Sequence, residues 1–272
     1  MLSDETVAVI GAGNIGHALI GGMIESELIA PNNVIATRRT ESALETMAEE
    51  FPGLQTTTDN VKAVTNASIV ILTIKPQSRA EVVTNIRDHI DREVLVISVL
   101  AGITTERLQL GFGQDQPVIR AMPNTPALVD AGATAVAAGT YASETHLDMA
   151  REIFEAVGEV ITVPEEQMDA ITGLSGSGPA YVYMFIEALT DAGVKQGLSR
   201  ADAAKLSAQT VYGAAKLAIE TGKHPAILRD EVTTPGGTAI AAVSSLEEHG
   251  LRTMLINAVG TATQRSRELN EE

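Results

Sequence analysis

The fold is decided by the stretch Val7-Ala-Val-Ile-Gly-Ala-Gly-Asn-Ile-Gly16. Its first four residues are a continuous apolar run, which is typical of a strand that is buried on both faces of a sheet. Three glycines with the spacing Gly-x-Gly-x-x-Gly follow at once, and an apolar-periodic stretch then runs to about Ile29. This order predicts a buried strand, a tight turn and a helix.

A turn of this kind predicts a dinucleotide-binding loop. Gly11 permits the turn, Gly13 lets the backbone approach a pyrophosphate, and Gly16 allows the helix to pack closely. The helix N-terminus supplies amide donors and the positive end of a dipole. A purely structural glycine turn is the alternative. It is the weaker one, because the loop begins an alternating pattern of strands and helices.

The alternation extends over the first half of the chain. Short runs rich in β-branched residues follow the loop, with helical stretches between most of them, at residues 34–37, 68–73, 93–98, 118–121 and 133–136. Strands that alternate with helices predict an α/β fold with a mostly parallel, Rossmann-type sheet. The alternation stops near residues 159–164, so we expect a dinucleotide-binding domain over residues 1–163 and an all-helical domain over residues 164–272.

The helical half is apolar on more than one face. Apolar residues recur there at helical spacing, as at Val182, Phe185, Ile186 and Leu189, while many of their neighbours are Ala or Gly. In a monomer, about a hundred residues of this kind would leave large apolar surfaces exposed to water. We therefore expect this half to form an intertwined dimer.

The composition excludes several classes of partner. The chain carries 35 acidic and 19 basic side chains, and its net charge of −16 repels nucleic-acid backbones and anionic membranes. Because it has no cysteine, it has no disulfide, no thiolate nucleophile and no cysteine-based metal site. The acidic residues 1–6 do not resemble a signal peptide and no apolar run reaches membrane-spanning length, so we expect a cytoplasmic protein.

The acidic charge also suggests a hypothesis about salt. Arginine outnumbers lysine among the few cations, and an acidic, lysine-poor surface suits a cytoplasm of high salt concentration. An ordinary acidic protein is the alternative. Loss of structure on removal of molar salt would separate the two.

The segment after the second strand predicts which dinucleotide binds. An acid at this place binds the ribose 2′-hydroxyl of NAD and repels the 2′-phosphate of NADP. The chain has Thr37-Arg38-Arg39-Thr40 there, whose guanidinium groups can hold a phosphate. NADP is therefore favoured as the cofactor, with solvated surface arginines as the alternative interpretation.

Other segments of the sequence are also expected to bind ligands. Thr73-Ile-Lys-Pro76 and Ala101-Gly102 follow strands, and open sheets bind ligands at the carboxyl ends of their strands. In the helical half, the amides of Gly236, Gly237 and Thr238 could form a nest for a carboxylate, although a plain helix start is an equal alternative. The five histidines are scattered through the chain and none has metal-ligand spacing, so no metal centre is expected.

The chain resembles the pyrroline-5-carboxylate reductases over essentially its whole length. The resemblance rests on the glycine loop and on several further motifs in the same order along the chain. These are Lys75-Pro76, Val118-Ile-Arg-Ala-Met-Pro-Asn-Thr-Pro126, Gly173-Leu-Ser-Gly-Ser-Gly-Pro-Ala-Tyr181, His224-Pro225, Thr234-Pro-Gly-Gly-Thr238 and Leu255-Ile-Asn-Ala258. The resemblance implies reduction of 1-pyrroline-5-carboxylate to L-proline, the last step of proline biosynthesis, with NADPH or NADH as donor. It also implies a homodimer through the helical domain, or a ring of such dimers.

The resemblance implies the following site residues. Cofactor contacts would fall on Gly11, Ala12, Gly13, Asn14, Ile15, Gly16, Thr37, Arg38, Arg39, Asn60, Thr73, Ile74, Lys75, Pro76 and Ala101. Substrate contacts would fall on Glu165, Thr234, Gly236, Gly237, Thr238 and Ala239. The family commonly has a threonine where this chain has Ala239, so either Thr238 or water would assist protonation of the imine nitrogen.

Two alternatives have other functions. A β-hydroxyacid dehydrogenase shares this type of fold and carries a catalytic lysine followed by asparagine four residues later. Here Lys216 is followed by Glu220 and Lys195 by Ser199, so that pattern is absent. A non-catalytic NADP-binding regulator is the other alternative, and Ala239 is the residue that favours it. Such a regulator would bind the dinucleotide without reducing an imine.

Overall fold

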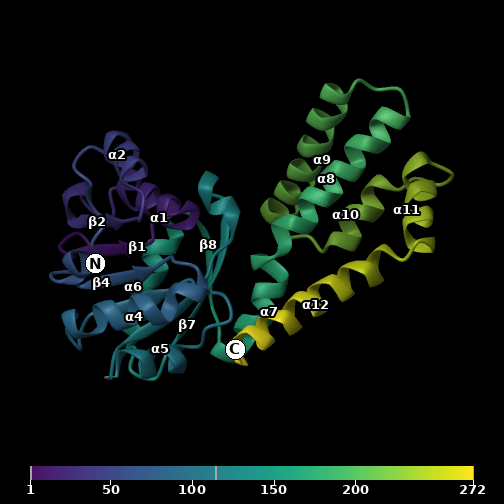
Figure 1. Cartoon of the computed structure of the whole chain (residues 1–272). Helices are drawn as coiled ribbons and strands as arrows, with labels where there is room; N and C mark the ends of the chain where they lie inside the picture. Colours follow the sequence, from purple (N-terminus) through teal and green to yellow (C-terminus); the bar gives the residue numbers. More distant parts are fainter. Residues whose placement is uncertain (1, 114, 272) are drawn as a thin grey trace. The chain divides into compact units, whose positions relative to one another are not determined.

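The computed structural model describes residues 2–113 and 115–271, which divide into two compact units (Figure 1). The sheet unit extends to Ser177 and also contains the end of the chain from Gly260. The helical unit comprises residues Gly178–Val259.

The sheet unit is built on one eight-stranded sheet with the order β3-β2-β1-β4-β5-β6-β7-β8. All neighbouring strands are parallel except β6 and β7, which are antiparallel. The predicted mostly parallel α/β fold is therefore confirmed. The strands are β1 (Val7–Ile10), β2 (Val34–Thr37), β3 (Gln55–Thr57), β4 (Ile69–Leu72), β5 (Leu95–Ser98), β6 (Val118–Met122), β7 (Gly132–Ala138) and β8 (Gly158–Thr162).

Helices cover both faces of this sheet. They are α1 (Asn14–Glu25), α2 (Glu41–Glu50), α3 (Asn60–Val64), α4 (Arg79–Ile86), α5 (Thr105–Phe112), α6 (Glu144–Glu155) and α7 (Met168–Ile171). Alternate residues of β1 enter different cores, because successive side chains of a strand point to opposite faces. Val7 and Val9 pack with α1, α2 and α6, whereas Ala8 and Ile10 pack with α3, α4 and α5. This explains why the central strands are continuous apolar runs.

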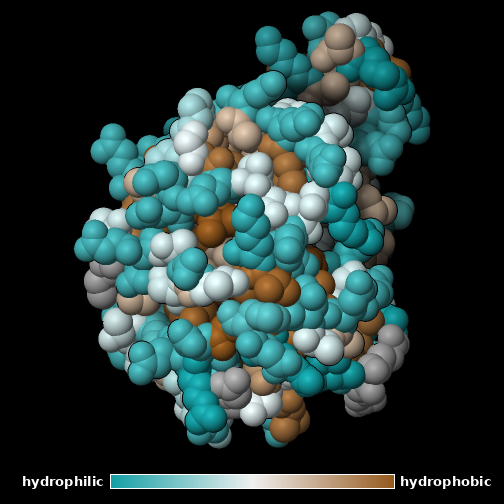
Figure 2. Space-filling model, turned by 60° about the vertical axis from the view of Figure 1, so that its left-hand side comes forward, coloured by the Kyte–Doolittle hydropathy of each residue, from teal (hydrophilic) through white to brown (hydrophobic). Residues whose placement is uncertain are grey.

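The sheet unit keeps most of its apolar residues inside. Figure 2, in which the left-hand side of Figure 1 is turned forward, shows a surface that is mainly hydrophilic with small hydrophobic patches. The two cores on either side of the sheet contain nearly all the buried large aliphatic side chains of this unit.

The predicted boundary after residue 163 marks the end of the strands but not the end of the sheet unit. The buried Met168 of α7 packs with Ala135 and Ala137 of β7, and a π-helical turn, Thr172–Gly176, follows α7. The last helix also returns to this unit, where Ser266 donates a hydrogen bond to Asp169. Both contacts keep residues beyond 163 in the sheet unit.

The helical unit contains few buried side chains of its own. Its helices are α8 (Gly178–Lys195), α9 (Arg200–Thr221), α10 (Pro225–Val232), α11 (Thr238–Glu248) and the first part of α12 (Leu251–Glu271). Ala203 is the only buried hydrophobic residue in Gly178–Val259, all of which the structure describes. Many large apolar side chains are exposed instead: Val182, Tyr183, Met184, Phe185, Leu198, Leu206, Tyr212, Leu217, Ile219, Ile227, Val232, Ile240, Leu246, Met254, Leu255 and Ile256.

Candidate active site

The glycine loop lies where the strand order reverses. The chain runs outward from β1 to β2 and β3, and then crosses to β4 on the other side of β1. Ligands of open α/β sheets bind at this point, beyond the carboxyl ends of the strands. Gly11 follows β1 directly and has φ +90°, a backbone conformation that glycine adopts without strain.

The three glycines have different surroundings. A Cβ atom on Gly11 would meet Ile74 Cγ2 at 2.6 Å, and one on Gly16 would meet Thr73 Oγ1 at 2.8 Å. At Gly13 the nearest atom would be the Gly11 carbonyl oxygen at 3.8 Å. Gly11 and Gly16 therefore permit internal packing, while the space beside Gly13 is open. This arrangement fits a dinucleotide whose pyrophosphate lies against the backbone at Gly13.

The N-terminus of helix α1 has the features of an anion-binding site. Gly13 is its N-cap residue, no side chain caps its first amides, and its first turn has no acidic residue. The first-turn amides of a helix have no partner within the helix, and they lie at the positive end of its dipole. The loop thus offers donors and a favourable potential to a phosphate group.

Thr37 is engaged inside the fold. Its hydroxyl donates to Asn60 Oδ1 at 2.8 Å and accepts from the amide of Gly11 at 3.2 Å, while its carbonyl accepts from the amide of Ala12 at 2.7 Å. Thr37 is buried. It holds the end of β2 against the glycine loop, whereas the neighbouring Arg38 and Arg39 are both exposed.

The segment after β4 closes the other side of the loop. The Thr73 hydroxyl donates to the carbonyl oxygen of Gly11 at 2.9 Å, which ties β4 to the turn after β1. Lys75 is exposed, and Pro76 begins a short 3₁₀ turn. Ala101 is half-buried after β5, the strand that pairs with β4. The structure therefore brings together the segments at residues 11–16, 37–39, 60, 73–76 and 101 at one edge of the sheet.

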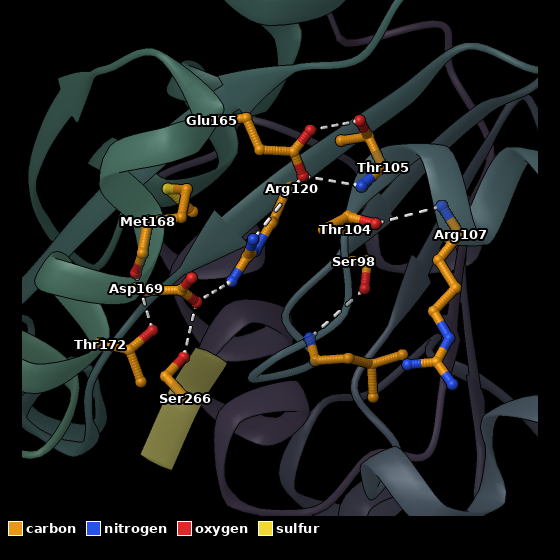
Figure 3. A network of polar contacts seen from close by, with 11 residues as sticks. Ser98, Thr104, Thr105, Arg107, Arg120, Glu165, Met168, Asp169, Thr172 and Ser266 are labelled. Atoms are coloured by element: carbon orange, nitrogen blue, oxygen red, sulfur yellow. Dashed lines mark hydrogen bonds and ion pairs between the residues drawn. The ribbon is translucent and has the colours of Figure 1, made fainter. Parts of the chain in front are cut away.

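Glu165 belongs to a polar network that surrounds the buried Arg120 of β6 (Figure 3). One carboxylate oxygen of Glu165 accepts from the Thr105 amide at 2.7 Å and the other accepts from the Thr105 hydroxyl at 2.5 Å. Arg120 lies 3.6 Å from Glu165 and 3.3 Å from Asp169. Both carboxylates are thus bound within the sheet unit.

Of the residues in this network, only Glu165 was predicted from the sequence as a site residue. A signal was present, because an arginine between apolar neighbours in a strand buried on both faces needs an anionic partner. Its second partner, Asp169, lies in the short helix α7 and also accepts from Ser266 at 2.7 Å. Nothing in the sequence pairs these distant residues.

In the helical unit, a tight turn leads into α11, whose first amides have no side-chain cap. The Gly237 amide donates to the Thr234 carbonyl oxygen at 2.9 Å and Gly236 has φ +68°, so Pro235 and Gly236 form a tight turn. Helix α11 begins at Thr238 without a side-chain cap and without an acid in its first turn. Thr238 is exposed and Ala239 is half-buried. The turn and helix start can accept a carboxylate.

Two further findings concern the described residues, 2–113 and 115–271. None of their helices is long and apolar enough to cross a membrane. They contain no group of three or more His, Asp or Glu side chains arranged to hold a metal ion.

Family models match both parts of the chain. Residues 6–102 match the model described as NADP oxidoreductase, coenzyme F420-dependent, and residues 165–269 match the model for pyrroline-5-carboxylate reductase dimerisation. The pyrroline-5-carboxylate reductase of Methanosarcina acetivorans is 42% identical over 271 residues, with 100% of each chain covered. The chain belongs to the pyrroline-5-carboxylate reductase family.

Solved structures of pyrroline-5-carboxylate reductases have the same fold. The Coxiella burnetii protein is 38% identical with a TM-score of 0.91, and the match covers 97% of this chain and 98% of that one. The Plasmodium falciparum protein, solved with NADP bound, is 28% identical with a TM-score of 0.89 and coverage of 99% and 100%. The chain is therefore an NADP(H)-dependent oxidoreductase of this family. Its dimerisation region indicates that it forms a homo-oligomer.

Proposed function

We propose that the chain reduces 1-pyrroline-5-carboxylate to L-proline with NADPH. The observation that carries this function is the family identity over the full length, which includes both the glycine loop and the dimerisation region. The β-hydroxyacid dehydrogenase alternative has no support, since Lys216 forms an exposed ion pair with Glu220, 3.6 Å away. The predicted cytoplasmic location stays a prediction.

The cofactor would be held by the edge of the sheet at β1, β2 and β4. The first-turn amides of α1 bind its pyrophosphate, and Arg38 and Arg39 are free to bind the 2′-phosphate. Thr37 and Thr73 position the glycine loop through their hydrogen bonds rather than contacting a phosphate with their hydroxyls. Bound NADPH supplies the hydride for the imine carbon.

The substrate carboxylate would bind at the start of α11. The first amides of α11, from Thr238 onward, and the Thr234 hydroxyl are its donors, whereas the Gly237 amide already donates to Thr234. These contacts fix the ring before hydride transfer. A proton on the imine nitrogen makes its carbon a better acceptor. The exposed Thr238 hydroxyl, or water, meets this nitrogen because Ala239 has no hydroxyl.

Glu165 takes a positioning role in this proposal. Its two oxygens already accept hydrogen bonds from Thr105, and Arg120 lies beside it. A carboxylate with these partners is held at the start of α5 rather than directed at a ligand. We therefore infer that Glu165 orders the segment between β5 and α5.

The proposal predicts how replacing Arg38 and Arg39 changes the cofactor preference. Arg38→Gln/Arg39→Gln is expected to weaken NADPH binding at least about tenfold, since charge-assisted contacts to the 2′-phosphate are lost. The KM for NADH should stay unchanged, because NADH has no such phosphate. Arg151→Gln removes a surface charge from α6 and serves as the matched control. Equal losses for NADPH and NADH would contradict the assignment.

We further propose that the exposed apolar residues of the helical unit form the homodimer interface. Ile219 and Ile256 are 78% and 70% exposed. In Ile219→Asp/Ile256→Asp, burial of two carboxylates should lower the dimer affinity by more than about tenfold. Sedimentation velocity across a concentration series measures this. Val129→Asp, at a 74% exposed site in the sheet unit, is the control. An unchanged dimer would contradict the proposal, and the same experiment reports any ring of dimers.

The function itself is tested by turnover. Purified protein, NADPH and fresh 1-pyrroline-5-carboxylate are mixed at low and at molar salt, and NADPH absorbance and proline are followed together. Proline formation that matches NADPH consumption is expected at one salt concentration or both. NADPH binding without proline at either salt would favour the non-catalytic regulator.

A further inference from the structure

Three arginines surround one pocket between α4 and α5. The cavity has a volume of about 220 Å³, and its lining includes Arg79, Arg87 and Arg107 but no acidic residue. Apolar atoms of Val83 and Leu108 form part of its wall. Such a cluster is unexpected in a chain of net charge −16 with only 19 basic side chains.

The positive charges in this pocket are poorly compensated. Among the side chains of residues 2–113 and 115–270, no carboxylate lies within ion-pair distance of Arg79 or Arg107. Burial, and the nearby charge of Arg107, lower the pKa of Arg79. The two guanidinium groups therefore repel each other across the pocket.

Arg87 adds an unsatisfied donor. Its Nε is buried without a hydrogen-bond partner and forms only a long ion pair, 3.7 Å, with Asp88. Arg107 donates through Nη1 to the Asn270 carbonyl oxygen at 2.5 Å, and Figure 3 shows its side chain directed away from the Arg120 network. Arg107 also lines the pocket.

We propose that this pocket binds the phosphate group of a small anion, either inorganic phosphate or a phosphorylated metabolite. Guanidinium groups bind phosphate through paired N–H donors, and a dianion relieves the repulsion between neighbouring arginines. The volume suits a phosphate group with a few further atoms. None of the proposed cofactor residues lines this pocket.

Isothermal titration calorimetry tests the proposal on the full-length protein at constant ionic strength, with inorganic phosphate in one arm and glucose 6-phosphate in the other. Arg79→Gln/Arg87→Gln should lower phosphate affinity at least about tenfold. Arg151→Gln, on the surface of α6, should retain it. Tighter binding of glucose 6-phosphate identifies a phosphorylated metabolite as the ligand, whereas tighter binding of phosphate identifies the free ion.

Two results would overturn the proposal: unchanged affinity in the Arg79→Gln/Arg87→Gln protein, or loss of affinity only in Arg38→Gln/Arg39→Gln, which would place the phosphate at the cofactor site. A second measurement needs no variant. Phosphate should slow modification of Arg79, Arg87 and Arg107 by phenylglyoxal in the unaltered protein, as measured by peptide mass spectrometry, and equal modification rates with and without phosphate would also overturn it.

Discussion

Replacing Gly13 by glutamate is expected to lower NADPH affinity at least about 100-fold, equivalent to roughly 3 kcal/mol. The backbone at Gly13 has φ −82° and ψ −155°, which other residues adopt, and a Cβ there meets only the Gly11 oxygen at 3.8 Å. The new carboxylate would occupy the path of the pyrophosphate and repel it. Helix α1 itself should tolerate a negative charge at its N-terminus. Calorimetric titration with NADPH measures the loss.

The matched variant at Gly11 should behave differently. Gly11→Ala places a Cβ 2.6 Å from Ile74 Cγ2 at a residue with φ +90°, so thermal stability should fall. Gly13→Glu should unfold at the temperature of the unaltered protein. Retained NADPH affinity in a folded Gly13→Glu protein would contradict the location proposed for the pyrophosphate.

Replacing Arg120 by methionine is expected to lower the free energy of unfolding by about 3 kcal/mol or more. Arg120 is 2% exposed and stands beside Glu165 and Asp169, which are 25% and 16% exposed. Its removal leaves two largely buried carboxylates without their cation. Urea unfolding, followed by far-ultraviolet circular dichroism at fixed protein concentration, gives the difference.

A triple variant separates charge from packing in this network. Arg120→Met/Glu165→Gln/Asp169→Asn removes all three charges and should recover most of the lost stability, because replacing a complete buried ion network is far less costly than breaking it. Equal instability in the single and triple variants would assign the loss to packing. A single variant as stable as the unaltered protein would contradict the structural role of Arg120.

The fold could be predicted where the physical pattern is local. The run Val7–Ile10 and its glycine loop predict strand, turn and helix within one stretch, and strand–helix alternation predicts parallel pairing. The strand β3 was missed, because Gln55–Thr57 is a short polar edge strand without an apolar run. Its pairing with β2 depends on tertiary contacts.

The site was predictable in its segments but not in the roles of single side chains. The family resemblance implies a cofactor contact at Thr37, yet its buried hydroxyl bonds to Asn60 and Gly11. The arginine pocket could not be foreseen either, because Arg107 reaches Arg79 only through the packing of α5 against α4. Contacts between distant segments decide both cases.

Transfer of deuterium tests the central claim most directly. The protein is incubated with 1-pyrroline-5-carboxylate and NADPH that carries two deuterium atoms at nicotinamide C4, and the proline is analysed by mass spectrometry and NMR. A pyrroline-5-carboxylate reductase gives proline with one deuterium, located at C5. Bound NADPH without labelled proline, at low and at molar salt, would contradict the account.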